Sequence, residues 1–379
     1  MSGGVDSSVA AWRLKEQGYE CVGVHMQTGL GEAEIGHEVQ DAADRVAGEC
    51  SPATGDSSCA SGGGCAAEGA SGARQVAEQL GIPLEVLSFR AEFERIIVHF
   101  VDEYVRGRTP NPCVICNRRV KFGRLLDYAD SVGAAFIATG HYARVLRQGG
   151  EVFLARSQNR PKDQSYVLFG IRRERLSRCL LPLGEMDDKA AVRRIAADLG
   201  LTAHNRPESQ EICFVPDNDY RALVRARRPD AVRTGEVRDS EGRVLGSHEG
   251  VVNYTIGQRR GLGIAAGTPI YVTRLDAATN TVIVGPREEL HADGLIAERL
   301  NWLTDPPPAG LWCSGQVQIR YHHAAVPGTF RRLDDGTLEV RFGRPQAAVT
   351  PGQAVVLYRE DGVVLGGGWI ARSTTRGDD

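Results

Sequence analysis

The chain opens with a glycine- and serine-rich stretch that has the composition of a phosphate-binding loop: Ser2-Gly3-Gly4-Val5-Asp6-Ser7-Ser8. Glycines let the backbone turn so that successive N–H groups point into one concavity, and the start of the following helix adds partial positive charge. Asp6 is unusual there, because a carboxylate repels a polyphosphate unless it caps the helix or meets Mg²⁺. No Gly-Lys-Ser/Thr ending follows, so this is not the loop type that presents a γ-phosphate for transfer.

Two cysteines form a C-x-x-C pair in the stretch GRTPNPCVICNRRVKF (107–122). Two prolines flank Asn111, and we expect them to keep the segment extended until after Asn117. Cys113 and Cys116 would then lie at or just before a helix N-terminus, where a thiolate is favoured and a nucleophile is easily formed. The cations expected to add to this effect are Arg118, Arg119 and Lys121. The spacing alone leaves zinc, a redox pair and a nucleophile open.

A third cysteine, Cys213, lies in the strand-like stretch ESQEICFVP (208–216) after a polar loop. Alone it is equally well explained as a small buried hydrophobic residue. Together with Cys113 and Cys116 it raises the alternative of a three-cysteine iron–sulfur cluster, which the spacing permits but does not demand. Three more cysteines, Cys50, Cys59 and Cys65, lie in a low-complexity segment that is more typical of a solvated insertion than of a metal site.

The elements that must position these residues change character along the chain. Helical and strand-like segments alternate up to about residue 225, which is typical of a parallel sheet in an α/β domain. Residues 30–73 interrupt this pattern with small residues and no periodicity, and we expect a flexible surface insertion there. Short strand-like runs separated by turn dipeptides follow. We expect three domains: 1–225, a small β-rich domain over 226–290, and a C-terminal β-barrel over 291–379.

Composition indicates an ordinary globular protein. The chain has 379 residues, 42% hydrophobic residues and a net charge of −3, and it holds no apolar run long enough to span a bilayer. Nine cysteines without a secretory context argue against a disulfide scaffold and favour the cytoplasm. With no overall basic charge, any RNA must be bound by local patches. The candidate patches are Arg118/Arg119/Lys121, Arg172/Arg173/Arg175, Arg225/Arg227/Arg228 and Arg259/Arg260. Only four of 45 basic residues are lysines, which hints that a compact ammonium is needed where lysine remains.

The opening loop resembles the PP-loop of ATP pyrophosphatases, which adenylate a substrate and release pyrophosphate. Six motifs in order extend the resemblance over nearly the whole chain to the tRNA-specific 2-thiouridylases, the MnmA/TrmU family. These are SGGVDSS, GRTPNPCVICNRRVKF, ATGHYAR (138–144), KDQSYVLFGI (162–171), ESQEICFVP and YTIGQRRGLGI (254–264). Only the segment 30–73 has no recognised counterpart.

The resemblance implies sulfur transfer to carbon 2 of the wobble uridine (position 34) of certain tRNAs. The C2 oxygen is adenylated by ATP with Mg²⁺, and AMP is displaced by sulfur delivered as a cysteine persulfide. By motif, Cys116 is the nucleophile and Cys213 carries the persulfide, and the two finish as a disulfide. By the same resemblance, the residues expected to bind ATP are Ser2, Gly3, Gly4, Val5, Asp6, Ser7, Ser8, Met26 and Gly140. The residues expected to contact tRNA are Asn111, Pro112, Cys113, His141, Lys162, Asp163, Gln164, Arg320, Tyr321 and Gln353. A persulfide donor protein is the implied partner, no metal ligands are assigned, and a monomer is expected.

Three points stay open. Some family members have Asp at the position of Cys113, where the carboxylate is thought to assist acid–base chemistry, so a role for this thiol is not assigned. Other PP-loop enzymes, such as a GMP-synthetase-like enzyme or a different tRNA sulfurtransferase, and a non-catalytic RNA-binding protein are the alternatives. Family members carry a strand directly before the loop, and this chain begins within the loop. We therefore expect a loop without its strand, a gap in the parallel sheet, and a start annotated too far downstream or a truncation.

Overall fold

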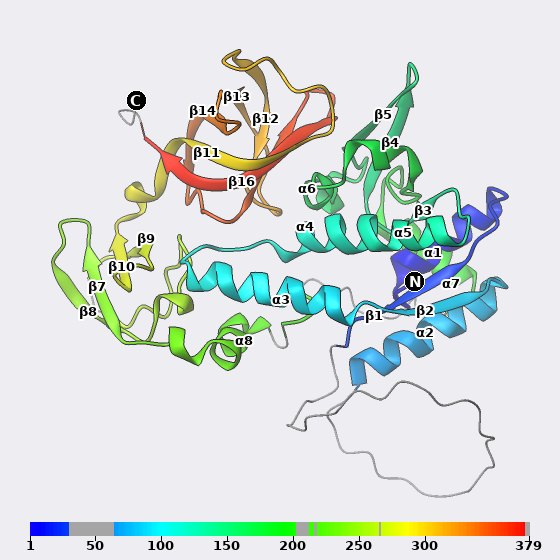
Figure 1. Cartoon of the computed structure of the whole chain (residues 1–379), viewed down its shortest axis with the longest axis horizontal. Coiled ribbons are helices and arrows are strands. Elements are labelled where there is room, and N and C mark those ends of the chain that lie inside the picture. Colours follow the sequence, from blue (N-terminus) through cyan, green and yellow to red (C-terminus); the bar gives the residue numbers. More distant parts are fainter. Residues whose placement is uncertain (30–63, 202–211, 216–217, 265–266, 376–379) are drawn as a thin grey trace, which may run out of the picture.

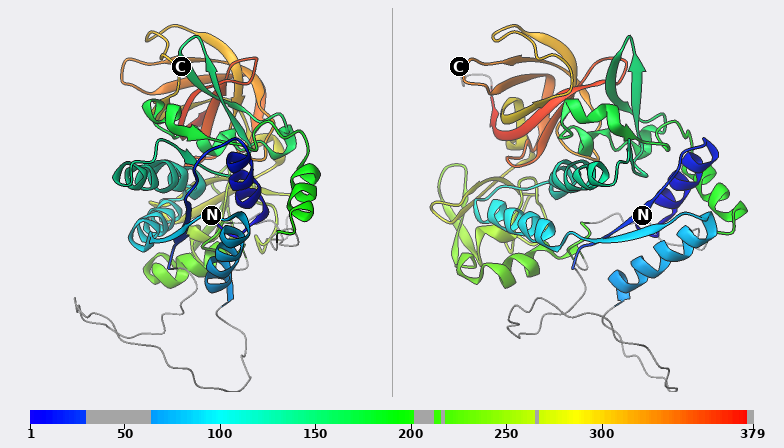
Figure 2. Two further views of the ribbon diagram at one scale, coloured as in Figure 1. Left: turned by 90° about the vertical axis from the view of Figure 1, so that its right-hand side faces the viewer. Right: turned by 45° about the vertical axis from the view of Figure 1, so that its right-hand side comes forward.

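The computed structural model describes residues 1–29, 64–201, 212–215, 218–264 and 267–375. Three regions follow one another along the chain: an α/β region, a small sheet and a closed barrel (Figure 1). Both views in Figure 2 show the barrel stacked on the α/β region rather than extended away from it. This arrangement confirms the expected fold class, in which a parallel-sheet domain precedes a small β-rich module and a barrel.

The α/β region alternates helices with short strands. Its helices are α1 (Val5–Glu16), α2 (Gly64–Leu80), α3 (Arg90–Val105), α4 (Pro112–Cys116), the π-helical turn η1 (Asn117–Arg124), α5 (Leu125–Ser131), η2 (Arg160–Lys162), α6 (Ser165–Leu168), η3 (Arg173–Arg178), α7 (Lys189–Asp198) and α8 (Tyr220–Arg227). Its strands are β1 (Gly23–Gln27), β2 (Leu84–Ser88), β3 (Ile137–Ala138), β4 (Ala143–Gln148), β5 (Glu151–Arg156) and β6 (Cys179–Leu180).

The parallel strands occur as two separate pairs. β1 pairs with β2 with Gly23 opposite Leu84, and β3 pairs with β6 with Ile137 opposite Cys179, whereas β4 and β5 form an antiparallel hairpin. Among the described residues no strand precedes the loop at Ser2, and none joins the two parallel pairs. The amino nitrogen of Met1 instead donates to the carbonyl oxygen of Val24 on β1.

The C-terminal part is built from β-strands, as alternating hydrophobic runs predict. The middle sheet has the order β8-β7-β10-β9, and the barrel closes in the order β11-β14-β13-β12-β15-β16. These strands, with the short helices between them, are η6 (Pro229–Ala231), β7 (Gly235–Asp239), β8 (Val244–His248), η7 (Val251–Asn253), β9 (Tyr271–Asp276), β10 (Thr281–Gly285), η8 (Arg287–Leu290), β11 (His291–Trp302), β12 (Cys313–Gln318), β13 (Val326–Arg332), β14 (Leu338–Ala347), β15 (Ala354–Tyr358) and β16 (Val364–Thr374).

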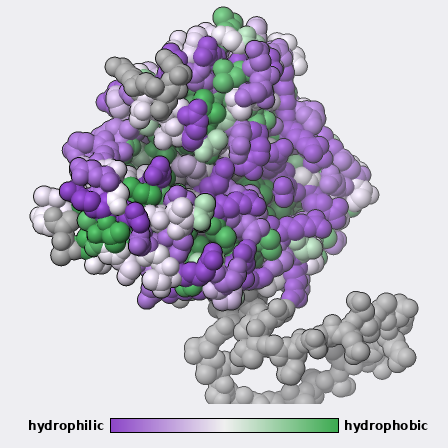
Figure 3. Space-filling model, turned by 60° about the vertical axis from the view of Figure 1, so that its left-hand side comes forward, coloured by the Kyte–Doolittle hydropathy of each residue, from purple (hydrophilic) through white to green (hydrophobic). Residues whose placement is uncertain are grey.

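One hydrophobic core crosses all three regions and fixes their relative placement. It contains Phe100 on α3, Phe169 after α6, Val282 on β10 and Trp369 on β16, which are all buried. The barrel interior and the α1–α7 contact have smaller cores of their own. Hydrophilic residues dominate the face in Figure 3, with apolar side chains gathered in smaller areas. Within the described ranges no helix combines the length and apolar character needed to cross a bilayer.

Three local expectations are wrong. Helix α2 begins at Gly64, so helical structure starts nine residues before the end of the expected insertion. Helix α4 begins at Pro112 rather than after Asn117, because Asn111 caps it by accepting from the Val114 N–H at 3.4 Å and proline suits the first helical position. Cys213 lies in a turn rather than a strand, and the Val215 N–H closes that turn on the Ile212 carbonyl at 2.9 Å. The expected flexible segment over 30–63, with Cys50 and Cys59, lies outside the described residues.

Candidate functional site

The serine-rich loop folds into a compact hydrogen-bonded turn at the start of α1. The hydroxyls of Ser7 and Ser8 donate to the Gly4 carbonyl at 3.0 and 2.9 Å, and the Ser2 and Ser7 hydroxyl oxygens lie 3.1 Å apart. Gly3 has a φ of 74°, a left-handed conformation that favours glycine. Gly4 is the N-cap and supplies no side chain, so the first N–H groups of α1 receive no side-chain cap. This is the arrangement that a helix start needs to accept an anion.

The carboxylate of Asp6 is bound by a lysine and a tyrosine. Its Oδ1 accepts from the Tyr142 hydroxyl at 2.8 Å and forms an ion pair with Lys189 Nζ at the start of α7. The Lys189 ammonium also lies 5.1 Å from the centre of the Tyr142 ring. The carboxylate therefore neither caps the helix nor stands free for Mg²⁺, and its partners lie more than 130 positions away in the sequence.

The segment after β3 packs directly against the loop. A Cβ atom on Gly140 would lie 2.7 Å from the backbone carbon of Asp6, so only glycine fits there. The neighbouring His141 is 8% exposed, and its Nδ1 lies 2.7 Å from the Thr139 hydroxyl. Burial, and after it the charge of Lys121, lowers the pKa of His141 well below its ordinary value, so the imidazole is neutral at neutral pH. Met26, at the other expected ATP position, lies near the end of β1 and packs on the main core.

The three cysteines of the two motifs lie near one another as free thiols. Charge–charge interactions connect Cys213 with both Cys116 and Cys113, and connect Cys116 with Cys113. Cys113 sits in the first turn of α4 and Cys116 ends that helix, which leads directly into η1. The Asn117 side chain holds this junction by donating to the Val167 carbonyl at 3.0 Å.

The expected depression of the thiol pKa values is wrong. Surrounding protein atoms desolvate the thiols, and this burial raises the pKa of Cys113 and of Cys116 and raises that of Cys213 to about 12. By surface area Cys113 and Cys213 are exposed, so reagents can reach thiols that water solvates poorly. Desolvation is the largest contribution at each thiol and outweighs the charge of Lys121.

One cation opposes this desolvation at all three thiols, and it is Lys121. The half-buried Lys121 lies on η1 and forms no ion pair with a carboxylate in the part of the chain that the structure describes. Arg118 and Arg119, which were expected to act with it, do not contribute at the thiols. The same lysine lowers the pKa of His141, so its charge acts on both the cysteines and the segment that packs on the loop.

These groups were also compared with the arrangement that a metal ion needs. Among the described residues no three His, Cys, Asp or Glu side chains converge closely enough to hold a metal ion. The alternative of a cluster bound by Cys113, Cys116 and Cys213 therefore finds no support in the arrangement of the thiols. Cys65 lies on α2, whose first residues are described by their backbone alone.

Most residues expected to contact tRNA lie where the α/β region meets the barrel. Gln353 donates to the Thr109 and Pro110 carbonyls at 3.0 and 3.3 Å, just before Asn111 and the buried Pro112. Arg320 donates to the Ala348 carbonyl within the barrel.

Two further members of this set, Tyr321 and Gln164, contact neighbouring tyrosines. Tyr321 stands 6.2 Å from Tyr166, measured between ring centres. The Gln164 amide oxygen accepts from the Tyr142 N–H at 2.9 Å. These contacts connect the barrel with the segment that carries His141.

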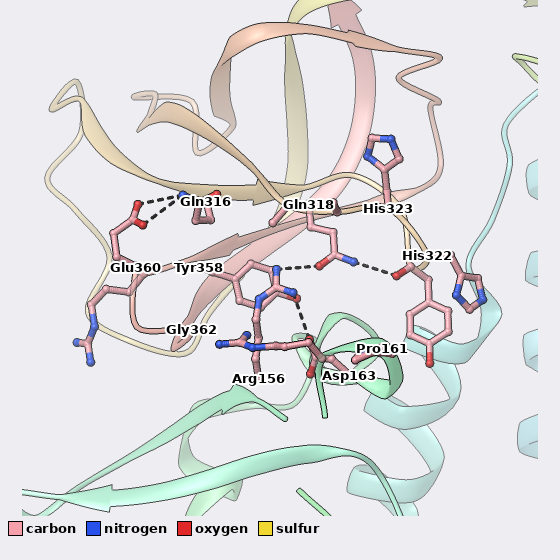
Figure 4. Close-up of a pocket in the computed structure, with 15 residues that line it drawn as sticks. Arg156, Pro161, Asp163, Gln316, Gln318, His322, His323, Tyr358, Glu360 and Gly362 are labelled. Carbon is pink, nitrogen blue, oxygen red and sulfur yellow. Dashed lines mark hydrogen bonds and ion pairs between the residues drawn. The ribbon is translucent and has the colours of Figure 1, made fainter. Parts of the chain in front are cut away.

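A pocket of about 590 Å³ opens at the same junction (Figure 4). Its lining includes Asp163 and Tyr321 together with Arg156, His322 and Glu360. Asp163 is fully engaged, because it accepts from the Ser157 N–H at 2.9 Å, from the Ser165 hydroxyl at 2.8 Å and from Arg156 at 3.3 Å. Asp163 thus holds the pocket wall, while Lys162 ends the adjoining η2.

Sequence reasoning missed Lys189 and Tyr142, which complete the loop. The available signal was the rarity of lysine, since Lys189 is one of four. Tyr142 lies in the motif ATGHYAR, but nothing in the sequence around it indicates that its hydroxyl reaches Asp6.

Comparison with known proteins places each region in a described family. Residues 1–217 match the model described as tRNA methyl transferase HUP domain, residues 225–286 its PRC-barrel domain, and residues 292–370 the aminomethyltransferase beta-barrel domain. The chain is 48% identical over 379 residues to a protein of Geobacter metallireducens named tRNA-specific 2-thiouridylase MnmA, covering 100% of this chain and 97% of that one. Proteins of the same name from Clostridium perfringens and Carboxydothermus hydrogenoformans are 43% and 46% identical, each over 98% of this chain and 96% of the relative.

Proposed function

The chain belongs to the family of tRNA-specific 2-thiouridylases, and from this premise we propose that it is a tRNA-uridine 2-sulfurtransferase. It replaces the C2 oxygen of the wobble uridine of tRNA with sulfur at the expense of ATP. The observation that carries the proposal is that the charge of Lys121 acts on Cys113, Cys116 and Cys213 and also on His141, whose neighbour Gly140 packs on the loop.

The loop would bind ATP and support adenylation. The uncapped N–H groups of α1 are suited to the phosphates, and the hydroxyls of Ser7 and Ser8 hold the loop by donating to the Gly4 carbonyl. The C2 oxygen attacks the α-phosphorus, the bond to the bridging oxygen breaks, and pyrophosphate leaves. Because Asp6 is already bound by Lys189 and Tyr142, we expect Mg²⁺ to arrive on the ATP phosphates rather than on a site built by the protein.

Sulfur transfer would use two cysteines in sequence. The terminal sulfur of a persulfide on Cys213 attacks C2, the C2–O bond breaks, and AMP leaves with the oxygen. The Cys116 thiolate then attacks Sγ of Cys213, so the S–S bond to the transferred sulfur breaks and its electron pair forms the thiocarbonyl. A Cys116–Cys213 disulfide remains, and an external dithiol must reduce it before the next turnover. Lys121 supports this scheme because a nearby cation favours the thiolate and persulfide anions over their neutral forms.

The residues at the junction of the α/β region and the barrel would contact the tRNA. Asn111, Arg320, Tyr321 and Gln353 are held there by the contacts described above, and Cys113 is exposed beside them. We further propose a persulfide donor protein as the sulfur source, and a monomeric enzyme acting in the cytoplasm.

Nucleoside mass spectrometry tests the proposal. The protein is incubated with tRNA, ATP, Mg²⁺ and a persulfide source, and the digested tRNA is searched for 2-thiouridine. We expect this product with wild-type protein and none with Cys116→Ser, which should retain nearly full tRNA affinity. Product formation by Cys116→Ser would refute the assigned role, and a methylated uridine in place of 2-thiouridine would refute the reaction.

A further inference from the structure

Four arginines on three separate elements form a positively charged cluster beside the thiol-bearing helix. Arg118 and Arg119 lie on η1, Arg172 follows α6, and Arg299 lies on β11 of the barrel; we refer to them as the four-arginine cluster. All four residues are exposed. Arg118 and Arg119 were expected to lower the pKa values of the thiols, but among the three neighbouring cations only Lys121 has this effect.

Close packing brings the three elements together. The Asn301 side chain on β11 donates to the carbonyls of Phe169 and Ile171 at 2.6 and 2.8 Å, so the segment leading to Arg172 is tied to the strand that carries Arg299. A Cβ atom on Gly170 would lie 3.5 Å from Cβ of Arg118. The cluster is therefore built by tertiary contacts and is not a run of charges along one helix.

The positive charges of the cluster are poorly neutralised. Among the described residues Arg118, Arg119 and Arg172 form no ion pair with a carboxylate, and Arg299 has only Glu298 at 3.6 Å, which Arg108 also binds at 3.3 Å. Burial, and after it the charges of Arg119, Arg172 and Arg299, lowers the pKa of Arg118. The charges of the other three guanidinium groups thus act on Arg118, while Arg299 also interacts with Glu298 and Glu103.

Other exposed arginines of the chain behave differently. Arg238 pairs with Glu236 at 2.5 Å, Arg243 with Asp239 at 2.7 Å and Arg359 with Asp361 at 2.6 Å. In a chain of net charge −3, carboxylates are available for pairing, so a cluster without them costs folding free energy. A bound polyanion would recover that cost.

We propose that the four-arginine cluster binds the phosphodiester backbone of the RNA substrate, next to the nucleotide that reaches Cys116. This inference rests on the proposed function. Arg118 and Arg119 follow Cys116 by two and three positions, so a strand that places a base at the thiols would carry its flanking phosphates past η1. Planar guanidinium groups bind phosphate oxygens in pairs, and several of them on different elements fit a chain of repeated phosphates. An acidic sulfur-donor protein is the competing occupant and is separated by the test.

The test measures tRNA binding as a function of salt. We compare Arg118→Gln/Arg119→Gln/Arg172→Gln with Arg238→Gln/Arg243→Gln/Arg359→Gln, a control that loses the same charge at paired sites. Each lost phosphate contact makes the slope of log affinity against log salt concentration shallower by about 0.9. At 0.1 M salt this corresponds to a loss of affinity of about eightfold. We expect the cluster variant to bind tRNA on the order of 100-fold more weakly and its slope to be shallower by about 2–3. The control variant should keep the affinity and the slope of the wild-type protein. A charge-preserving Arg→Lys triple variant should retain the slope of the wild-type protein.

The outcomes separate the inference from the proposed function. If wild-type protein forms 2-thiouridine but the glutamine triple variant keeps its affinity and salt slope, the RNA-binding role is wrong. If that variant binds tRNA normally and thiolates with a small-molecule persulfide but not with a donor protein, the cluster docks the donor and the inference is also wrong. If wild-type protein forms no 2-thiouridine, the proposed function fails, and the salt slope still shows whether the cluster binds RNA. Unchanged thermal unfolding of the triple variant establishes that it is folded.

Discussion

Replacing Lys121 with methionine should make the thiols of Cys113, Cys116 and Cys213 less reactive. Lys121 is the one cation that opposes desolvation at Cys113 and Cys116, and the folded state already raises the pKa of each. An opposite charge within about 4–6 Å changes the population of an ion by one to three orders of magnitude. Because desolvation remains the dominant effect, we take the lower end, about tenfold in thiolate or about 1.4 kcal/mol.

The assay is the rate of alkylation by iodoacetamide at pH 7.5, followed by mass spectrometry of the peptides that contain Cys116 and Cys213. Both rates should fall about tenfold in Lys121→Met, and thiolation should fall at least as much. Lys121→Arg should restore most of the alkylation rate because it keeps the charge. Loss of a half-buried cation without a carboxylate partner should leave thermal stability unchanged or higher. Alkylation that is unchanged or faster in Lys121→Met would refute the assignment of this lysine.

Further predictions concern the loop and the pH dependence. Gly140→Ala should lower ATP–pyrophosphate exchange by at least about tenfold, because its Cβ would meet the Asp6 backbone at 2.7 Å, whereas unchanged exchange would contradict that packing. Lys189→Met should raise the KM for ATP and leave tRNA affinity unchanged, because it frees the carboxylate of Asp6 beside the phosphates; a filter-binding assay and ATP titration distinguish the two. The thiolation rate should keep rising from pH 7 to 9, since burial raises the pKa of Cys116, whose thiolate must release the sulfur from Cys213; a plateau below pH 8 would contradict this. The pKa of His141 is lower in the folded state than in the unfolded chain, so its contribution to the free energy of unfolding is complete above about pH 6.5. As the pH falls below that value, the contribution decreases by about 1.4 kcal/mol per pH unit. His141→Gln should reduce this decrease when stability is measured by urea titration at several pH values.

Some features of the molecule follow from local sequence, and others do not. Hydrophobic periodicity predicts the helix at α3 and the switch to β-structure after residue 225, because both depend on which face of an element is buried. The two prolines predict a later start for α4 than Pro112, because local sequence does not show that Asn111 caps the helix. The apolar residues Ile212, Phe214 and Val215 predict a strand at Cys213, but the segment forms a turn in which tertiary contacts bury Phe214 and Val215.

The electrostatics of the site could not be read from spacing. Neighbouring cations suggested low thiol pKa values, but the balance depends on desolvation by atoms distant in sequence. Which of Arg118, Arg119 and Lys121 faces the thiols depends on the π-helical turn of η1, which alters the angular spacing of side chains after Cys116. The pairing of Asp6 with Lys189 spans 183 positions and needs the packing of α1 against α7.

The central claim is that Cys213 carries the sulfur and Cys116 releases it to the uridine. A single turnover with ³⁴S-labelled persulfide on Cys213, with ATP, Mg²⁺ and tRNA but no reductant, tests it most directly. Mass spectrometry should find ³⁴S in 2-thiouridine and an equal amount of Cys116–Cys213 disulfide. Labelled 2-thiouridine without that disulfide, or label that stays on the protein while unlabelled product forms, would contradict the account.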